Sequence, residues 1–232
     1  MTPHYIYLLP LYNKAHVLKN TITILEQIEN KKVFFIENGS TDQSKEMCEN
    51  LIYDKKDYKI LSSKKGFGNA LRVGLEEIRQ QNSSILVITG ADMPFELSDI
   101  NYVNDVLDNK FEVCIGSKAH KESQINRLFR RKLISKIFNF MLKKFFELKI
   151  KDTQGSILIN LNEISLDSIS IKSEGFFSSV EILIILKKLN FKIEEIPIIH
   201  LNDKTDVSSV NIFSDSLEIL KEMFRFKYNI KG

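Results

Sequence analysis

Apolar runs of four to six residues alternate with longer amphipathic segments through the first half of this 232-residue sequence. Such runs, bounded by turn residues, predict buried β-strands, and the longer segments between them predict helices. The predicted strands are Tyr5–Leu9, Val33–Ile36, Tyr58–Leu61, Ser84–Thr89 and Glu112–Gly116, and the predicted helices are Ala15–Ile28, a segment ending near Tyr53, Phe67–Gln80 and Leu97–Leu107. This alternation is typical of an α/β fold with a mostly parallel sheet and helices on both faces. Because crossovers between parallel strands are right-handed, we expect the loops that follow the strands to meet at one edge of the sheet.

The second half of the sequence departs from this rhythm. Its predicted elements are a long helix rich in Phe and Lys at Arg127–Leu148, strands at Ile157–Ile159 and Phe191–Ile199, and helices at Phe177–Leu189 and Ile212–Phe226. No linker rich in Pro, Gly or Ser separates the two halves. We therefore expect a single domain, residues 1–232, with a helix-rich C-terminal elaboration.

Composition excludes several classes of protein. The net charge of +3 is too small to indicate a nucleic-acid partner, and 43% hydrophobic with 27% charged residues is typical of a soluble globular chain. Cys48 and Cys114 belong to no metal-ligand pattern and are expected to be buried free thiols in a reducing cytosol. No apolar run approaches the ~18 residues of a membrane-spanning helix, although the protein could lie on a membrane surface.

The junction after the predicted strand Val33–Ile36 carries the clearest chemical signal. It reads Glu37-Asn38-Gly39-Ser40-Thr41-Asp42 and leads into a helix. Gly39 permits a sharp turn, and Ser40 or Thr41 can cap the helix. We expect free backbone N–H groups beside a carboxylate here, an arrangement that holds nucleotides at the carboxyl ends of strands. An ordinary capped turn is the alternative.

Three further loops carry residues of the same kind. Pro10-Leu11-Tyr12-Asn13-Lys14 offers an aromatic ring for a nucleobase. Gly66 and Gly68, in the run from Lys65 to Gly74, let the backbone approach a ligand or a neighbouring strand at the start of a helix. Gly90-Ala91-Asp92-Met93-Pro94 places a carboxylate just beyond a strand, which suits a metal ion or a position close to a phosphate.

In this order and spacing, the motifs resemble those of the family 2 glycosyltransferases with the GT-A fold. They are most similar to the dolichyl-phosphate mannose and glucose synthases and their bacterial polyprenyl-phosphate relatives. The family pattern is P-x-Y-N, a D-D-G-S-T-D turn, K-G-x-G-x-A-x-R-x-G, D-A-D and G-S-R. The likeness continues through Arg130–Ser135, Asp152–Gly155 and Phe177–Glu181 and covers roughly residues 5 to 205.

The resemblance implies roles for individual residues. Residues 1–118 would bind a nucleotide sugar, and residues 119–232 would face the acceptor and the membrane. The implied donor-binding residues are Pro10, Tyr12, Asn13, Glu37, Asn38, Gly39, Ser40, Lys65, Gly66, Gly68, Ala91 and Lys118. The implied acceptor-binding residues are Arg127, Ser135, Asp152 and Gln154, and the implied catalytic residues are Asp92, which is also the metal ligand, Glu181 and Arg131.

The chain also departs from the family pattern close to the donor. Lys14 replaces an acidic residue, Glu37-Asn38 replaces an aspartate pair, and Gly90 replaces the first aspartate of D-A-D. Pro94 stands where a further polar metal ligand is common, and Lys118 replaces an arginine. The sequence shows no C-terminal membrane helices like those of many relatives.

These departures leave the role of a metal open. Loss of a nucleoside diphosphate builds negative charge that Mg²⁺ or Mn²⁺ and basic side chains usually offset. A metal could be held mainly by the diphosphate and water, with Asp92 as its one carboxylate. Alternatively, cations could replace part of its charge, the candidates being Lys14, Lys65, Lys118, Arg127 and Arg131. In a third interpretation the protein binds a nucleotide sugar without catalysis.

The acceptor is indicated by the stretch Arg127–Lys151, which holds nine Lys or Arg residues against one acid, Glu147. This excess of positive charge suits a polyprenyl phosphate, and we expect inverting transfer to such a lipid by a cytoplasmic protein peripheral to the inner face of the membrane. A glycan hydroxyl is the alternative acceptor, and Glu181 is then the candidate general base. A purely helix-stabilising Glu181 is the competing interpretation.

The same stretch interleaves its basic residues with ten large apolar ones. This pattern is typical of an interfacial helix on anionic lipid, and a core-packed helix with a solvated lysine face is the alternative. The predicted last helix, Ile212–Phe226, could bind the same surface or form a homodimer contact.

Overall fold

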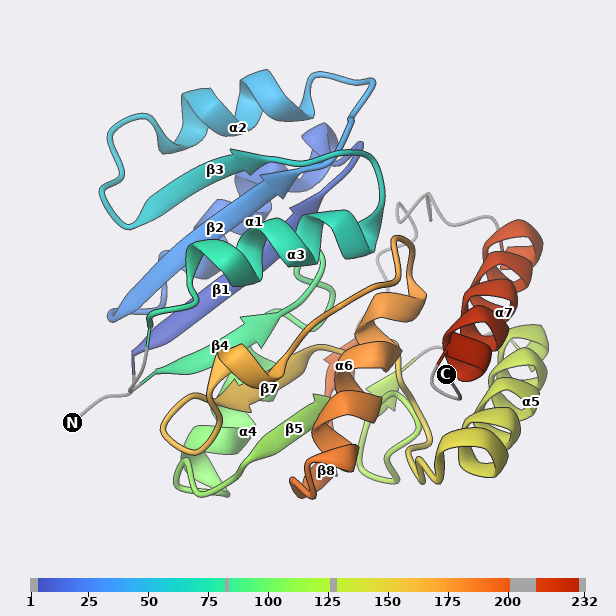
Figure 1. Ribbon diagram of the computed structural model, residues 1–232. Helices are drawn as coiled ribbons and strands as arrows, with labels where there is room; N and C mark the ends of the chain where they lie inside the picture. The colour runs from blue at the N-terminus through green and yellow to red at the C-terminus, as the bar shows by residue number, and fades with distance from the viewer. Residues whose placement is uncertain (1–3, 82–83, 126–128, 201–211, 230–232) are drawn as a thin grey trace.

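A seven-stranded sheet in the order β3-β2-β1-β4-β7-β5-β8 forms the centre of the molecule (Figure 1). The computed structural model describes residues 4–81, 84–125, 129–200 and 212–229, with the first turns of the two long C-terminal helices described as backbone only. The strands are β1 (Tyr5–Leu11), β2 (Lys31–Glu37), β3 (Tyr58–Ser62), β4 (Ile85–Ile88), β5 (Val113–Gly116), β7 (Ile157–Asn160) and β8 (Ile193–Ile196). Neighbouring strands are parallel except at β7, which runs antiparallel to β4 and β5. The prediction of an α/β fold with a mostly parallel sheet is confirmed.

Helices cover both faces of this sheet (Figure 1). One face carries α1 (Leu18–Leu25), α2 (Ser44–Ile52) and α4 (Ser98–Asp105), and the other carries α3 (Phe67–Glu77) and α6 (Phe177–Lys188). Along β1, Tyr7 and Leu9 pack against the first set of helices, and Ile6 and Leu8 pack against the second. A strand covered on both faces reads as a continuous apolar run, which is why β1 is buried along its whole length.

The first strand is longer than its sequence predicts. The sequence predicts that the strand ends at Leu9 and that a loop begins at Pro10. The structure corrects this: β1 continues to Leu11, and Pro10 pairs in register with Ile36 of β2. On its other side β1 pairs with β4 only as far as Leu8, so Pro10 faces a partner strand on one side alone.

The first helix is shorter than predicted. Instead of one helix over Ala15–Ile28, a 3₁₀ turn, η1 (Ala15–Val17), precedes α1, which ends at Leu25. The N–H groups of Gln27 and Ile28 bond three residues back, so the chain tightens into a turn after the helix. The other predicted helix ends that lie in described residues agree to within a few positions.

Proline also divides the last predicted strand. Phe191–Ile199 is not one strand: β8 ends before Pro197, and β9 (Ile199–His200) pairs with β6 (Gln124–Ile125) in a separate two-stranded sheet. Since Pro197 has no N–H to donate, the ladder is interrupted there. The small sheet lies beside the start of α4, because Ser98 Oγ accepts the N–H of Ile199 at 3.0 Å.

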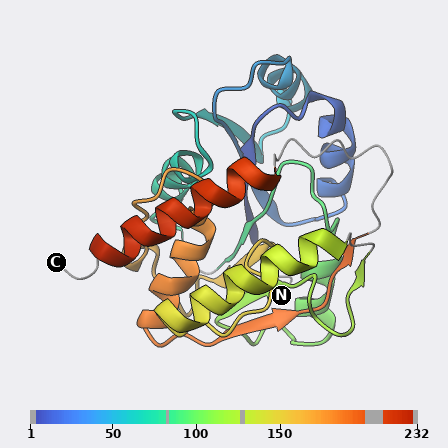
Figure 2. The same cartoon turned by 90° about the vertical axis from the view of Figure 1, so that its right-hand side faces the viewer.

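Two long helices, α5 (Phe129–Phe146) and α7 (Ile212–Asn229), lie side by side at one flank of the sheet (Figure 2). Ring centroids of Phe145 and Phe224 are 5.8 Å apart, and those of Phe146 and Phe226 are 5.9 Å apart. Phe226 also packs on Phe177 of α6, which fixes the pair against the core. None of the helices in the described residues is long and apolar enough to cross a membrane.

Both cysteines are free and buried, as predicted. Burial is the main reason that the pKa values of Cys48 and Cys114 are each raised to about 12. A protonated, buried thiol is a poor nucleophile and a poor metal ligand, so neither cysteine contributes to a site.

Candidate active site

Four loops meet at the carboxyl edge of β1, β2, β3 and β4, as the parallel topology requires. Side-chain contacts link them: the N–H of Asn13 donates to Ser40 Oγ at 3.2 Å, and Lys65 Nζ lies 5.1 Å from the centre of the Tyr12 ring. Lys14 Nζ lies 2.6 Å from Asp92 Oδ2. The structure therefore brings together residues that the sequence placed in four separate motifs.

Backbone N–H groups of the loop after β2 are hydrogen-bonded to nearby side chains. Glu37 Oε1 accepts the N–H of Gly39 at 2.8 Å and that of Ser40 at 2.5 Å, and Asn13 Oδ1 accepts the N–H of Thr41 at 2.8 Å. The expectation that free N–H groups stand beside a carboxylate is wrong in this respect, because that carboxylate binds two of them. Gly39 has φ of 91°, the left-handed conformation that the turn was predicted to need.

The capping prediction is also corrected. Helix α2 begins at Ser44, too far along for Ser40 or Thr41 to cap it. Asp42 Oδ1 instead accepts the N–H of Ser44 at 2.9 Å.

Asn38 is the residue of this loop with unused hydrogen-bonding capacity. It is 4% exposed, and its Oδ1 has no hydrogen-bond partner among the described residues, while its N–H donates to Leu11 O at 3.1 Å. A buried acceptor without a partner costs about 1–3 kcal/mol, which a ligand that donates an N–H or O–H would recover.

Gly66 and Gly68 make room for a neighbouring segment of the chain. A Cβ at Gly66 would lie 2.6 Å from the carbonyl oxygen of Glu174, and one at Gly68 would lie 2.1 Å from that of Ser173. The N–H of Gly68 donates to Glu174 O at 2.8 Å. The sequence left open whether these glycines let the backbone approach a ligand or a neighbouring part of the chain. The structure shows a close approach to residues 173 and 174.

That neighbour, residues 171–177, covers the start of α3 and is held from three sides. Arg72 donates to the carbonyls of Ile171, Lys172 and Ser173 at 3.0–3.4 Å. Glu181 accepts the N–H groups of Lys172 and Ser173, each at 2.8 Å.

The third group that holds residues 171–177 is Glu222 of α7. Its carboxylate accepts the N–H groups of Glu174 at 3.1 Å, Gly175 at 2.8 Å and Phe177 at 3.3 Å. Sequence reasoning missed Glu222, because no local pattern marks a glutamate whose partners are 45 to 48 residues away.

Glu181 is fully buried, with both carboxylate oxygens bound to backbone N–H groups. A general base must reach the proton of its substrate. The geometry therefore favours a structural role for Glu181, which holds residues 171–177 in place.

Lys118 and Asp152 form a second cluster beyond β5. Asp152 Oδ2 accepts the N–H of Lys118 at 2.9 Å and lies 3.7 Å from its Nζ. Lys118 Nζ also donates to Gln154 O at 3.2 Å and lies 5.0 Å from the centre of the Phe95 ring. Because Asp152 is 4% exposed, it acts on this cluster by orienting Lys118 rather than by lining an open surface.

The remaining predicted residues divide into two groups. Pro10 and Ala91 are buried backbone positions, and Ala91 O accepts Thr21 Oγ at 2.7 Å. Arg127 lies outside the described residues, and Arg131 and Ser135 are described only as backbone of α5.

The loop after β4 is shaped around Asp92. A Cβ at Gly90 would lie 2.5 Å from Asp92 Oδ1, so the aspartate carboxylate occupies the space beside the glycine. Met93 and Glu96 have φ of 44° and 47°, a conformation that non-glycine residues rarely adopt and that clusters at functional sites. No group of three or more His, Cys, Asp or Glu residues that could hold a metal occurs in the described part of the chain.

These donors do not fit a metal site built by the protein. A hard divalent cation prefers several oxygen ligands, and the one carboxylate here is already paired with an ammonium group at 2.6 Å.

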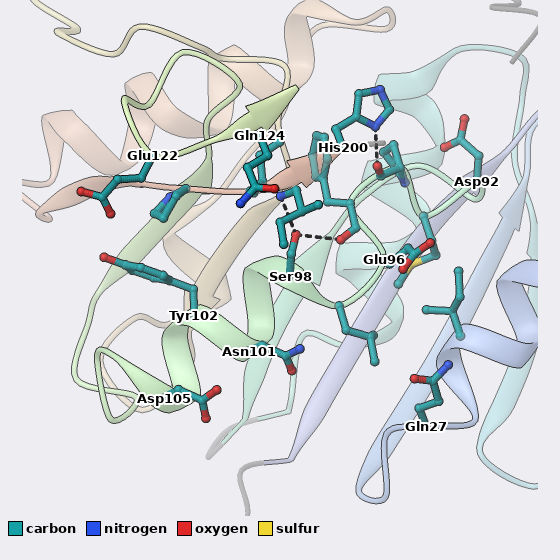
Figure 3. Close-up of a pocket in the computed structure, with 18 of the residues that line it drawn as sticks. Gln27, Asp92, Glu96, Ser98, Asn101, Tyr102, Asp105, Glu122, Gln124 and His200 are labelled. Atoms are coloured by element: carbon teal, nitrogen blue, oxygen red, sulfur yellow. Dashed lines mark hydrogen bonds between the residues drawn. The ribbon is translucent and has the colours of Figure 1, made fainter. Parts of the chain in front are cut away.

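A groove of about 750 Å³ adjoins Asp92 (Figure 3). It lies between α1, the 92–98 segment, α4 and the small β6–β9 sheet, and His200 Nδ1 is 2.6 Å from Pro94 O at its edge. The polar residues that line it are Asn20, Gln27, Asp92, Glu96, Ser98, Asn101, Tyr102, Asp105, Glu122, Gln124 and His200. The lining residues that the structure describes include no Lys or Arg. Sequence reasoning missed this groove, since its walls come from segments with no shared motif.

The mostly parallel sheet with its antiparallel strand β7 is a GT-A-like fold, and the family match places the chain among the glycosyltransferases with this fold. Residues 7–165 match the family described as glycosyl transferase family 2, and the chain belongs to that family. The resemblance drawn from the sequence motifs is therefore confirmed.

Individual relatives agree with this assignment. The dolichyl-phosphate β-glucosyltransferase of Saccharomyces cerevisiae is 27% identical over 93% of this chain and 71% of its own length. Glycosyltransferase AglJ of Haloferax volcanii is 25% identical over 94% of this chain and 70% of its own.

Among solved structures, the glucosyl-3-phosphoglycerate synthase of Mycobacterium tuberculosis superimposes with a TM-score of 0.67 at 13% identity, over 97% of this chain and 80% of that one. At this identity the likeness shows the fold alone. A further structure of that enzyme, with a TM-score of 0.66, 14% identity and the same coverage, contains Mn²⁺, UDP and glucosyl-3-phosphoglycerate.

Proposed function

We propose that this glycosyltransferase moves a sugar from a nucleotide-sugar donor to a polyprenyl phosphate at a membrane surface, with inversion at the anomeric carbon. The observation that carries the proposal is the exposure of large apolar and basic side chains on α5 and α7: Phe140 is 64% and Tyr228 68% exposed, and Lys143 and Lys144 are also exposed. Large apolar groups flanked by lysines suit an anionic lipid surface. The name of the S. cerevisiae relative, a dolichyl-phosphate β-glucosyltransferase, supports the same acceptor class.

The donor would lie at the carboxyl edge of β1 and β2. Tyr12 offers a ring to the nucleobase, the unpartnered Oδ1 of Asn38 offers an acceptor, and Lys65 beside Tyr12 offers a cation to the phosphates. The UDP in a structure of the mycobacterial neighbour supports a nucleotide-based donor.

A phosphate acceptor needs no general base, which agrees with a site in which Glu181 is not available to act as one. An oxygen of the lipid phosphate attacks the anomeric carbon, and the bond between that carbon and the diphosphate oxygen breaks with its electron pair staying on the diphosphate. The phosphate oxygen is already anionic, so no proton has to be removed. Both carboxylate oxygens of Glu181 accept backbone N–H groups, so Glu181 cannot act as a base, and this reaction does not require one.

Two experiments test the proposal. A thermal-shift screen against UDP, GDP, CDP and CMP sugars identifies the donor, because a ligand of the native state raises the melting temperature. Transfer is then measured from the radiolabelled donor to polyprenyl phosphate in vesicles that contain anionic lipid. We expect label in the organic phase. Label that moves only into water-soluble glycans would contradict the lipid acceptor.

The groove beside Asp92 favours a second candidate, transfer to a glycan hydroxyl. Its amide, hydroxyl and carboxylate groups suit sugar hydroxyls, and the absence of Lys and Arg among its described lining residues suits an uncharged acceptor better than a phosphate. Glu96 is exposed and lines the groove, and could serve as the base that a hydroxyl acceptor needs. Loss of glycan transfer in Glu96→Gln, with lipid transfer unchanged, would favour this candidate.

A further inference from the structure

Lys14 and Asp92 form a short ion pair in the middle of the candidate site. Lys14 Nζ lies 2.6 Å from Asp92 Oδ2, and the two side chains are 16% and 24% exposed. The N–H of Lys14 also donates to Ser44 Oγ at 2.7 Å, which anchors its backbone to the start of α2. Left-handed backbone at Asn13 and Met93, the residues next to the pair, fixes the direction of both loops.

Two departures from the family pattern affect this ion pair, one in the pair itself and one beside Asp92. Lys14 stands in place of an acidic residue, which changes the local charge by +2, and Gly90 stands in place of an aspartate, which changes it by +1. The carboxylate of Asp92 fills the space beside Gly90, 2.5 Å from where a Cβ would be. The site has therefore gained positive charge and lost ligand oxygens, and both changes act against binding of a divalent cation.

We propose that the Lys14 ammonium group, held in place by Asp92, is a catalytic group that replaces the charge of a divalent metal, and that this transferase acts without one. This inference rests on the proposed function, since it needs a diphosphate as leaving group. As the bond between the anomeric carbon and the diphosphate oxygen breaks, negative charge grows on the diphosphate, and a cation fixed in advance stabilises it. Lys14 keeps its proton throughout, and Asp92 acts as a positioning residue for its ammonium group.

The first test measures metal binding alone. Mn²⁺ is titrated into the metal-free protein and followed by electron paramagnetic resonance. We expect no stoichiometric binding by the wild type, and we expect a site in the double variant Lys14→Glu/Gly90→Asp, which restores two carboxylates beside Asp92. The Asp92 carboxylate is free to move away from the new Asp side chain once Lys14 no longer holds it. Tight Mn²⁺ binding by the wild type would overturn the inference.

The second test measures diphosphate binding. Affinity for UDP and GDP is determined by calorimetry in excess EDTA and in excess Mn²⁺. We expect wild-type affinity to agree within about twofold between the two conditions, a loss of about tenfold or more in Lys14→Ala and Lys14→Gln, and no change in Lys19→Ala, an exposed lysine on α1. Affinity that falls at least tenfold in EDTA while Lys14→Ala binds normally would contradict the proposal.

The two experiments separate this inference from the proposed function. A wild type that binds none of the UDP, GDP, CDP or CMP sugars of the donor screen refutes the proposed function, and the Mn²⁺ titration still decides whether Lys14 excludes a metal. Should the double variant fail to fold, Lys14→Gln tests the same charge with nearly the same side-chain length. Catalytic turnover of the wild type in EDTA, with at least a 100-fold loss in Lys14→Gln, would complete the support.

Discussion

The carboxylate of Glu222 on α7 accepts the backbone N–H of Gly175 at 2.8 Å. The last helix of the described chain is thereby tied to the segment that covers the start of α3, and through it to the loop that carries Lys65. A contact between parts of the chain 47 residues apart thus supports the donor side of the site from the helix whose exposed side we propose meets the membrane.

Removal of this carboxylate is expected to destabilise the protein. Glu222→Ala leaves the N–H groups of Glu174, Gly175 and Phe177 without their acceptor, at a cost of about 1–3 kcal/mol in the free energy of unfolding. Urea denaturation measures the change, and hydrogen exchange at these amides reports where it acts. Glu218→Ala, at an exposed position on the same helix, is the matched control. Equal stability of the two variants would show that the Glu222 contacts contribute nothing measurable.

A methyl group at Gly68 is expected to separate α3 from residues 171–177. The new Cβ would lie 2.1 Å from the backbone oxygen of Ser173, so Gly68→Ala should lower stability by about 1–3 kcal/mol. Gly90→Ala is the control, because the close neighbour of its Cβ is a side-chain oxygen of Asp92 and not backbone. Thermal denaturation of both variants gives the comparison, and a stable Gly68→Ala protein would mean that the two segments separate at little cost.

Loss of Asp92 is expected to abolish most activity and leave the fold intact. In Asp92→Ala the Lys14 ammonium loses the group that holds it, and we expect turnover to fall by about 100-fold. Circular dichroism and the melting temperature check the fold, and Asp54→Ala, at an exposed position beyond α2, serves as the control. Wild-type turnover in Asp92→Ala would show that the reaction centre is elsewhere.

Asp99 is expected to make stability depend on pH. Burial, the largest cause, raises the pKa of this carboxyl group to about 6 in the folded protein. Between the unfolded pKa of about 4 and this value the native state binds more protons than the unfolded state, so stability falls as pH rises, by up to about 3 kcal/mol. Asp99→Asn should flatten this part of the curve of unfolding free energy against pH. A slope identical to that of the wild type would assign the dependence to other groups.

Membrane binding is expected to depend on the exposed aromatic residues of α5 and α7. The double variant Phe140→Ser/Tyr228→Ser should bind vesicles of anionic lipid about tenfold more weakly in a flotation assay, because both rings lose their contact with lipid. Added salt should weaken binding of both proteins. Tyr53→Ser, at a ring that is 92% exposed next to α2, is the control. Absence of wild-type flotation would contradict the peripheral membrane proposal, and self-association in its place would favour a dimer contact.

The sequence by itself determined the sheet, most helices and the set of loops at one edge, because alternation between strands and helices is a local pattern that burial enforces along the chain. It also identified Lys14 and Gly90 as departures from the family pattern, since each stands inside a short, recognisable motif. The length of β1 was not recognised, because it depends on which strand lies alongside. The break at Pro197 was not recognised either, although proline marks it locally.

Only the tertiary structure decided which groups satisfy each other. Glu37 binds its own turn, Gly66 and Gly68 accommodate residues 171–177, and Glu181 points inward to backbone N–H groups. Lys14 meets Asp92 across 78 residues. Side-chain type and spacing describe what a residue can bind, whereas the crossovers and helix packing set its distance from each possible partner. A buried carboxylate needs hydrogen-bond partners, because the interior has a low dielectric constant. Whether its nearest partners are backbone N–H groups or a group in the site therefore decides whether its role is structural or catalytic.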